Sequence, residues 1–170
     1  MAVFEIDNFV NNARQAANAQ NPRAAIKSLM EATVGDPVTL QQSIPDYDED
    51  DIIWFEDEHV SIWHCRFIPG KSVPPHDHQM SATIGLYRGS ERNEFYNKPT
   101  DTGIIKSGEL ILQAGDVTQI GPNAIHSVRC VGDQPCCGIH VYLGKLTTVQ
   151  RSLVDPRSGE QLAFSDDNYQ

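Results

Sequence analysis

The chain has 170 residues, with 13 Lys plus Arg against 23 Asp plus Glu and a formal net charge of −10 at pH 7. This acidic balance argues against nucleic acid or an anionic membrane as a partner, because both would repel the protein. No apolar stretch approaches the length of about 18 residues that marks a membrane span, and the N-terminus lacks the basic and apolar regions of a signal peptide. We expect one cytoplasmic domain, residues 1–170, whose partner is a small molecule.

Residues 1–45 carry the signature of two or three helices. Apolar residues recur at helical spacing over 9–17 and again over 25–30. Asn21-Pro22 and Asp36-Pro37 each combine a capping side chain with a proline at the first helical position. The second pair predicts a short third helix over 38–43.

From residue 52 to 147 the sequence is typical of short β-strands separated by glycine turns. The runs of β-branched and aromatic residues lie at 52–55, 60–67, 82–88, 93–96, 110–113, 117–120, 125–131 and 138–143. Many short strands of this kind indicate an antiparallel sandwich or barrel rather than alternating βαβ units. We therefore expect a mainly β domain with the N-terminal helices packed on a barrel, followed by a polar C-terminal extension at 148–170.

Two segments of the barrel carry histidines in patterns that suggest a metal site. His76 and His78 stand at i and i+2, so on a strand both project from one face and can bind one ion. Alone this pair is a weak signal, because surface histidine pairs are common. The turn at 121–125 then delivers His126 as a third imidazole.

The order of these segments resembles the two motifs of the cupin superfamily: H-x-H, a strand that ends at Gly89, then G-x5-G-P-x3-H from Gly115 to His126. The resemblance implies a cupin barrel, also called a double-stranded β-helix, which is jelly-roll-like and holds His76, His78 and His126 together inside. Cupins usually add a glutamate ligand after the second histidine, but residues 79–83 contain no carboxylate. Three neutral ligands suit a redox-active divalent metal that must bind both substrate and dioxygen, and three imidazoles also make a catalytic zinc site. We expect one iron(II) per chain, with zinc or nickel as alternatives in the purified protein.

A further pair, His140 and Tyr142, presents an imidazole and a phenol on one strand face, and spacing alone fits either a catalytic pair or a structural tyrosine held by histidine. The sequence also resembles thiol dioxygenases of the cysteine dioxygenase and 3-mercaptopropionate dioxygenase type, which place a Ser-x-His-x-Tyr triad beside a three-His iron. The resemblance implies catalytic roles for His140 and Tyr142, with Gly138 in place of the serine. Arg88, beside the Gly89 turn, is a candidate for binding an anionic substrate, although a solvated hairpin end explains it equally well.

These features together predict a non-heme iron(II) dioxygenase that oxidises a small thiol to a sulfinate. The expected partners are that thiol and dioxygen, with no nucleic acid or membrane, and a homodimer is compatible with the sequence. Two alternatives stay open on the same scaffold. One is a dioxygenase that cleaves a non-thiol chelating substrate such as a β-diketone, and the other is a metal-binding cupin without catalytic activity.

Overall fold

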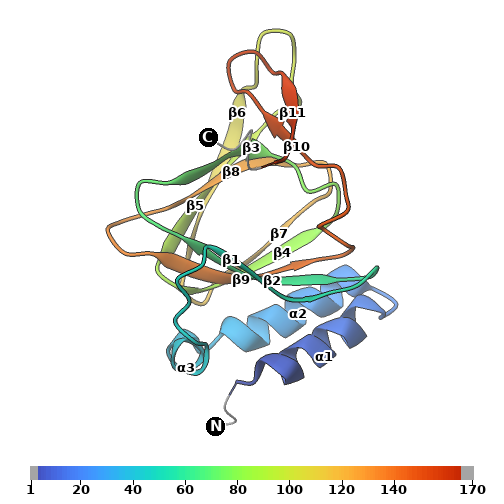
Figure 1. Ribbon diagram of the computed structural model, residues 1–170, viewed down its shortest axis with the longest axis vertical. Helices are drawn as coiled ribbons and strands as arrows, with labels where there is room; N and C mark the ends of the chain where they lie inside the picture. Colours follow the sequence, from blue (N-terminus) through green and yellow to red (C-terminus); the bar gives the residue numbers. More distant parts are fainter. Residues whose placement is uncertain (1–3, 166–170) are drawn as a thin grey trace.

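The computed structural model describes residues 4–165, which form two antiparallel sheets and three helices (Figure 1). The helices are α1 (Ile6–Ala17), α2 (Pro22–Val34) and α3 (Pro37–Ser43). The predicted caps are confirmed: Asn21 accepts a hydrogen bond from the Ala24 N–H, and Asp36 accepts one from the Thr39 N–H. Within residues 4–165 no helix combines the length and hydropathy that a membrane span requires.

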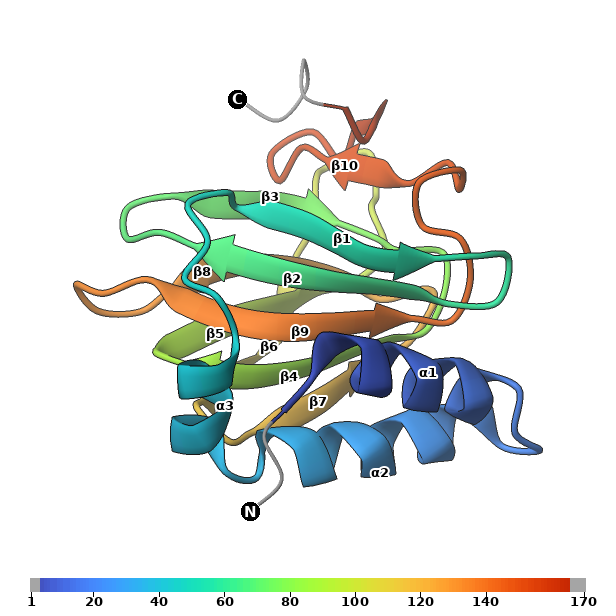
Figure 2. The same cartoon turned by 60° about the horizontal axis from the view of Figure 1, so that its bottom comes forward.

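Within residues 4–165, eleven strands follow the helices. They are β1 (Asp51–Glu56), β2 (Ser61–Phe67), β3 (Ser72–His76), β4 (Ala82–Arg88), β5 (Ser90–Tyr96), β6 (Lys106–Gln113), β7 (Val117–Ile120), β8 (Ile125–Cys130), β9 (Cys136–Tyr142), β10 (Ser152–Val154) and β11 (Gln161–Ala163). One sheet has the order β1-β2-β9-β4-β7 and the other β11-β10-β3-β8-β5-β6. Figure 1 shows them as facing walls of a barrel, and Figure 2 shows α1 and α2 against the outer face of the five-stranded sheet.

Strand β9 separates the two hydrophobic clusters, because all seven of its residues are buried. Ile139 and Val141 face the helices and pack in the outer cluster with Ile26 and Met30. Tyr142 belongs instead to the inner cluster between the sheets. Since successive strand residues point to opposite faces, this alternation also delivers His140 to the interior.

Three strands were not predicted from the sequence. β3 contains Pro74 and Pro75, which lack the N–H of a regular ladder, and its pairing with β8 shifts register between Val73 and His76. The expected C-terminal extension contributes β10 and β11, and β10 joins the six-stranded sheet through the pair Leu153 and His76. These strands span three residues each in a polar stretch, too short to show a period. The last residues of the extension, 166–170, lie outside the described part of the chain.

Candidate metal centre

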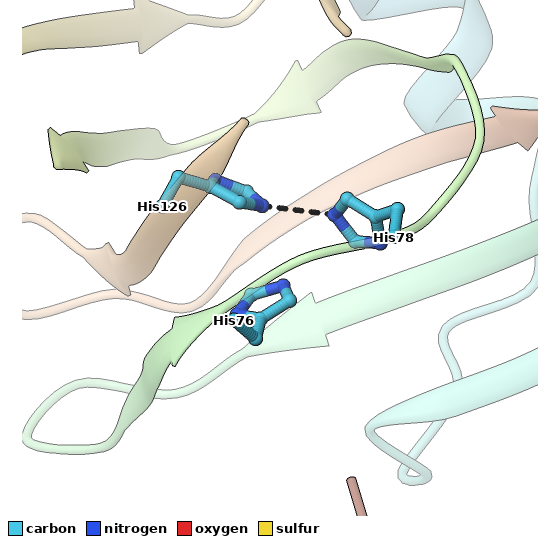
Figure 3. Close-up of side chains that lie close together, drawn as sticks. All are labelled: His76, His78 and His126. Atoms are coloured by element: carbon cyan, nitrogen blue, oxygen red, sulfur yellow. Dashed lines mark hydrogen bonds between the residues drawn. The ribbon is translucent and has the colours of Figure 1, made fainter. Parts of the chain in front are cut away.

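His76, His78 and His126 meet inside the barrel (Figure 3). His76 is the last residue of β3, His78 lies in the loop that follows, and His126 is the second residue of β8. All three are buried, and their ligand nitrogens lie within 4.8 Å of one another. The predicted trio therefore forms a three-histidine metal-binding site.

The expected strand geometry of the H-x-H motif is wrong in one respect, because β3 ends at His76 and does not include His78. The position of His78 depends instead on Asp77, which is anchored to β10. The Asp77 N–H donates to the Ser152 carbonyl, and the Ser152 N–H donates to Asp77 Oδ1 at 2.9 Å. Gln79 donates to the other carboxylate oxygen and takes a left-handed backbone conformation with φ 56°, which turns the chain away.

Hydrogen bonds on the far side of two imidazole rings settle which nitrogen faces the centre. His76 Nδ1 lies 2.8 Å from the Pro74 carbonyl oxygen, and His126 Nδ1 lies 2.9 Å from Asn93 Oδ1. Both oxygens accept, so both Nδ1 atoms carry the proton. The Nε2 atoms of His76 and His126 therefore present lone pairs to the centre, as metal ligands must.

The contact between His78 and His126 fits a shared ion. Their Nε2 atoms are 2.9 Å apart, and two nitrogens bound at right angles about 2.1 Å from one ion would be about 3 Å apart. His78 Nδ1 is buried and has no hydrogen-bond partner among the described residues.

Burial also keeps the three rings uncharged. It lowers the pKa of His76 to about 4 and the pKa values of His78 and His126 well below the usual range. Neutral imidazoles are the ligand form, so the site needs no deprotonation at pH 7. No Asp or Glu in residues 4–165 joins the cluster. This donor set fits a divalent transition metal with positions left for other ligands.

The three histidines line a cavity of about 170 Å³, smaller than the pockets that hold drug-sized ligands. Its other walls are mainly aromatic and aliphatic, with a few polar groups among them. These walls include Trp63, Phe67, His140, Tyr142, Arg151 and Phe164, together with the acidic residues Asp50 and Asp51.

His140 and Tyr142 enter this cavity from β9. His140 Nδ1 lies 3.1 Å from the Tyr142 hydroxyl, and the Tyr142 ring centroid is 5.2 Å from that of His78. Burial lowers the pKa of His140 to about 3 and raises the pKa of Tyr142 well above its usual value. At neutral pH the pair is therefore an uncharged imidazole and a protonated phenol.

The other nitrogen of His140, Nε2, is buried without a hydrogen-bond partner in the part of the chain that the structure describes. A Cβ atom added at Gly138 would lie 3.6 Å from it, so a serine here could reach this nitrogen. An unpaired buried N–H is rarer than an unpaired acceptor, which favours the tautomer with the proton on Nδ1. In that tautomer His140 donates to the Tyr142 oxygen, and the Tyr142 O–H is free to donate into the cavity.

The two arginines of interest lie in different places. Arg88, the residue suggested by the sequence, is not among the residues that line the cavity, and it pairs with Asp46 at 2.9 Å. Its role in substrate binding stays a prediction. Arg151, which the sequence analysis missed, lines the cavity, and its guanidinium lies 3.9 Å from the centroid of the Phe164 ring. No local pattern marks it, because only the pairing of β10 with β3 brings residue 151 to the histidines.

Comparison with solved structures agrees with this architecture. A protein with a double-stranded β-helix domain from Klebsiella pneumoniae matches with a TM-score of 0.50 at 16% identity, over 66% of this chain and 86% of that one. The fold is a cupin barrel. A RmlC-like cupin family protein from Methanocaldococcus jannaschii matches with a TM-score of 0.49 at 12% identity, over 61% of this chain and 90% of that one.

The DMSP lyase DddQ from Ruegeria pomeroyi matches with a TM-score of 0.47 at 17% identity, over 59% of this chain and 45% of the lyase. This chain therefore spans less than half of that enzyme. At such identities the likeness concerns the fold alone. No protein-family model matches the sequence.

Proposed function

We propose that this protein is a non-heme iron(II) dioxygenase that oxidises a small thiol bearing a carboxylate to its sulfinate, R–SH + O2 → R–SO2H. One observation carries the proposal. A single small cavity combines three neutral histidine donors, a protonated phenol and a guanidinium. Each of these groups matches one need of the reaction.

His76, His78 and His126 would hold the iron. When bound, iron(II) supplies the redox chemistry that dioxygen needs to react with a closed-shell thiolate, and its charge favours the thiolate form. The protein contributes fixed ring orientations through the hydrogen bonds from His76 to Pro74 and from His126 to Asn93. It also contributes apolar walls that limit the access of water.

Arg151 supports the choice of a substrate with a carboxylate. Among the described residues that line the cavity it is the one Lys or Arg, and a guanidinium matches the geometry of a carboxylate. Asp77 ties β10 to the H-x-H loop, so Arg151 and the ligand histidines belong to one connected unit. A short thiol would then have its sulfur toward the histidines and its carboxylate toward Arg151.

Tyr142 supports the proposal at the reacting end. Its ring lies near that of His78, and in the tautomer favoured above its hydroxyl is free to donate a hydrogen bond to substrate or oxygen. Because its pKa is raised, the phenol keeps this proton throughout the neutral range. His140 holds the phenol in place.

The test is oxygen consumption by protein loaded anaerobically with iron(II) and offered 3-mercaptopropionate, cysteine and cysteamine in turn. His126→Ala serves as the blank. We expect uptake with a carboxylate-bearing thiol and one sulfinate formed for each dioxygen. No uptake with any thiol at full iron occupancy would reject the proposal in favour of a chelator-cleaving enzyme or a non-catalytic metal-binding cupin.

A further inference from the structure

A buried carboxylate lies behind the metal site. Glu91 on β5 has no exposed surface, and its cross-strand neighbours are Leu112 on β6 and Cys130 on β8, both buried. An ionised carboxylate in such surroundings destabilises the fold unless another charge compensates it. Packing alone therefore does not explain a glutamate at this position.

Glu91 is joined to a metal ligand through one side chain. Asn93, also fully buried, donates from Nδ2 to Glu91 Oε1 at 2.7 Å, while Asn93 Oδ1 accepts from His126 Nδ1 at 2.9 Å. Since 91 and 93 are two residues apart on β5, both side chains point into the barrel. The second oxygen of Glu91 has no hydrogen-bond partner among the described residues.

No cation among the described residues compensates Glu91. Within residues 4–165 no Lys or Arg forms an ion pair with it, and its one stabilising contact is the Asn93 amide. The other ionisable groups that interact with it electrostatically are the thiols of Cys65 and Cys136 and the phenol of Tyr142, none of them positive. The metal site has the opposite imbalance, because three neutral imidazoles leave the charge of a divalent ion uncompensated.

We propose that Glu91 is the counter-charge of the metal site and a positioning residue for His126. With a divalent cation bound, Glu91 is ionised, and through Asn93 it holds the Nδ1–H of His126 and makes Nε2 a stronger donor. It thereby takes over the compensating role of the carboxylate ligand that residues 79–83 lack. This inference concerns the metal centre, so it does not depend on which reaction the protein catalyses.

The protonation of Glu91 offers a readout that is separate from catalysis. Burial raises the pKa of Glu91 to about 7 in the metal-free protein. If the bound cation ionises Glu91, metal binding below pH 7 releases a proton that the Glu91→Gln variant does not have. Metal affinity should therefore rise more steeply with pH in the wild type than in Glu91→Gln.

The experiment is a titration of metal-free protein with Co²⁺, followed by the visible absorption of the bound ion and by a pH indicator for proton release. Glu91→Gln keeps the shape and the acceptor for Asn93 but removes the charge. Glu94→Gln is the matched control, because Glu94 is on the outer face of the same strand and bonds Lys106. At pH 7 we expect Glu91→Gln to weaken Co²⁺ binding at least tenfold, and we expect its affinity to depend less on pH than that of the wild type, with Glu94→Gln within twofold of wild type.

Moving the charge one side chain closer provides a rescue. In the double variant Glu91→Gln/Asn93→Asp a carboxylate faces His126 directly, so Co²⁺ affinity should return to within a few-fold of wild type. Equal affinities and equal pH slopes in wild type and Glu91→Gln would overturn the inference. So would Co²⁺ binding to the wild type at pH 6 without proton release, a result that requires no variant to fold.

Discussion

On the proposed function, replacing Arg151 with Gln should change the preference between thiols rather than the overall activity. Arg151 is the one Lys or Arg among the described residues that line the cavity, so its loss removes the proposed partner of a substrate carboxylate. Cysteamine has an ammonium group and no carboxylate, so it has no ion pair with Arg151 that the same substitution could remove. The expected result is therefore a difference between the two thiols in how much activity each loses.

The size of the effect follows from the setting of Arg151. A hydrogen bond to a charged group contributes about 1.5–3 kcal/mol, and Arg151 is partly exposed, which places the loss near the middle of that range. About 2 kcal/mol corresponds to about a 30-fold loss in kcat/KM for 3-mercaptopropionate. For cysteamine we expect a change of less than about threefold, so the ratio of the two values should fall at least about tenfold.

The assay is initial-rate oxygen uptake with iron-loaded protein over a range of each thiol. Arg88→Gln is the matched control, because Arg88 pairs with Asp46 away from the cavity and its removal should leave both thiols within twofold of wild type. Equal losses for both thiols in Arg151→Gln would refute the reasoning and assign Arg151 a purely structural role. A selective loss in Arg88→Gln would return the substrate site to the residue suggested by the sequence.

Three further predictions follow from the cavity. Tyr142→Phe should lower kcat about 10- to 100-fold while Co²⁺ affinity stays within twofold of wild type. The reason is that Tyr142 contacts His140 and lines the cavity but is not a metal ligand. An unchanged kcat would contradict this prediction. Gly138→Ala should destabilise the protein in urea unfolding, because its Cβ would lie 3.0 Å from the Gly85 carbonyl oxygen. Gly138→Ser should be about 1 kcal/mol more stable than Gly138→Ala, because the serine hydroxyl can reach His140 Nε2. Equal stability of these two variants would show that no such bond forms. The metal-free protein should lose stability as pH falls from 6.5 toward 4, because burial lowers the pKa values of His64, His76 and His140 to about 4 or 3 and the unfolded chain therefore binds more protons. Glu91 acts in the opposite direction, because its pKa is raised to about 7 and its contribution to stability is lost as pH rises from 4.5 to 7. Glu91→Gln should therefore lose stability more steeply than the wild type as pH falls. Urea midpoints at pH 7, 6 and 5 would test both signs, and a flat profile would contradict them.

Much of the fold and of the centre could be predicted from local sequence. The caps at Asn21 and Asp36 begin the predicted helices because capping depends on a few neighbouring residues. The period of two in β9 places His140 and Tyr142 on one face, whatever strands flank it. His76, His78 and His126 could be grouped because their spacing resembles a known pair of motifs.

The remaining features depend on contacts between distant segments. Arg151 reaches the cavity because a three-residue strand, β10, pairs with β3. The role of Asp77 also depends on this pairing, because its carboxylate accepts a hydrogen bond from the Ser152 N–H of β10. Glu91 becomes the neighbour of His126 through Asn93 because β5 pairs with β8.

The sequence by itself therefore determined the helices, eight of the eleven strands within residues 4–165 and their turns, since each rests on the periodicity and chemistry of nearby residues. It also determined the three candidate ligands, through the resemblance of their spacing to known motifs. Only the tertiary structure decided which charges surround those ligands. Strand pairing depends on contacts between residues that are far apart in the sequence. The sequence of either strand alone therefore does not show which groups face one another across the barrel.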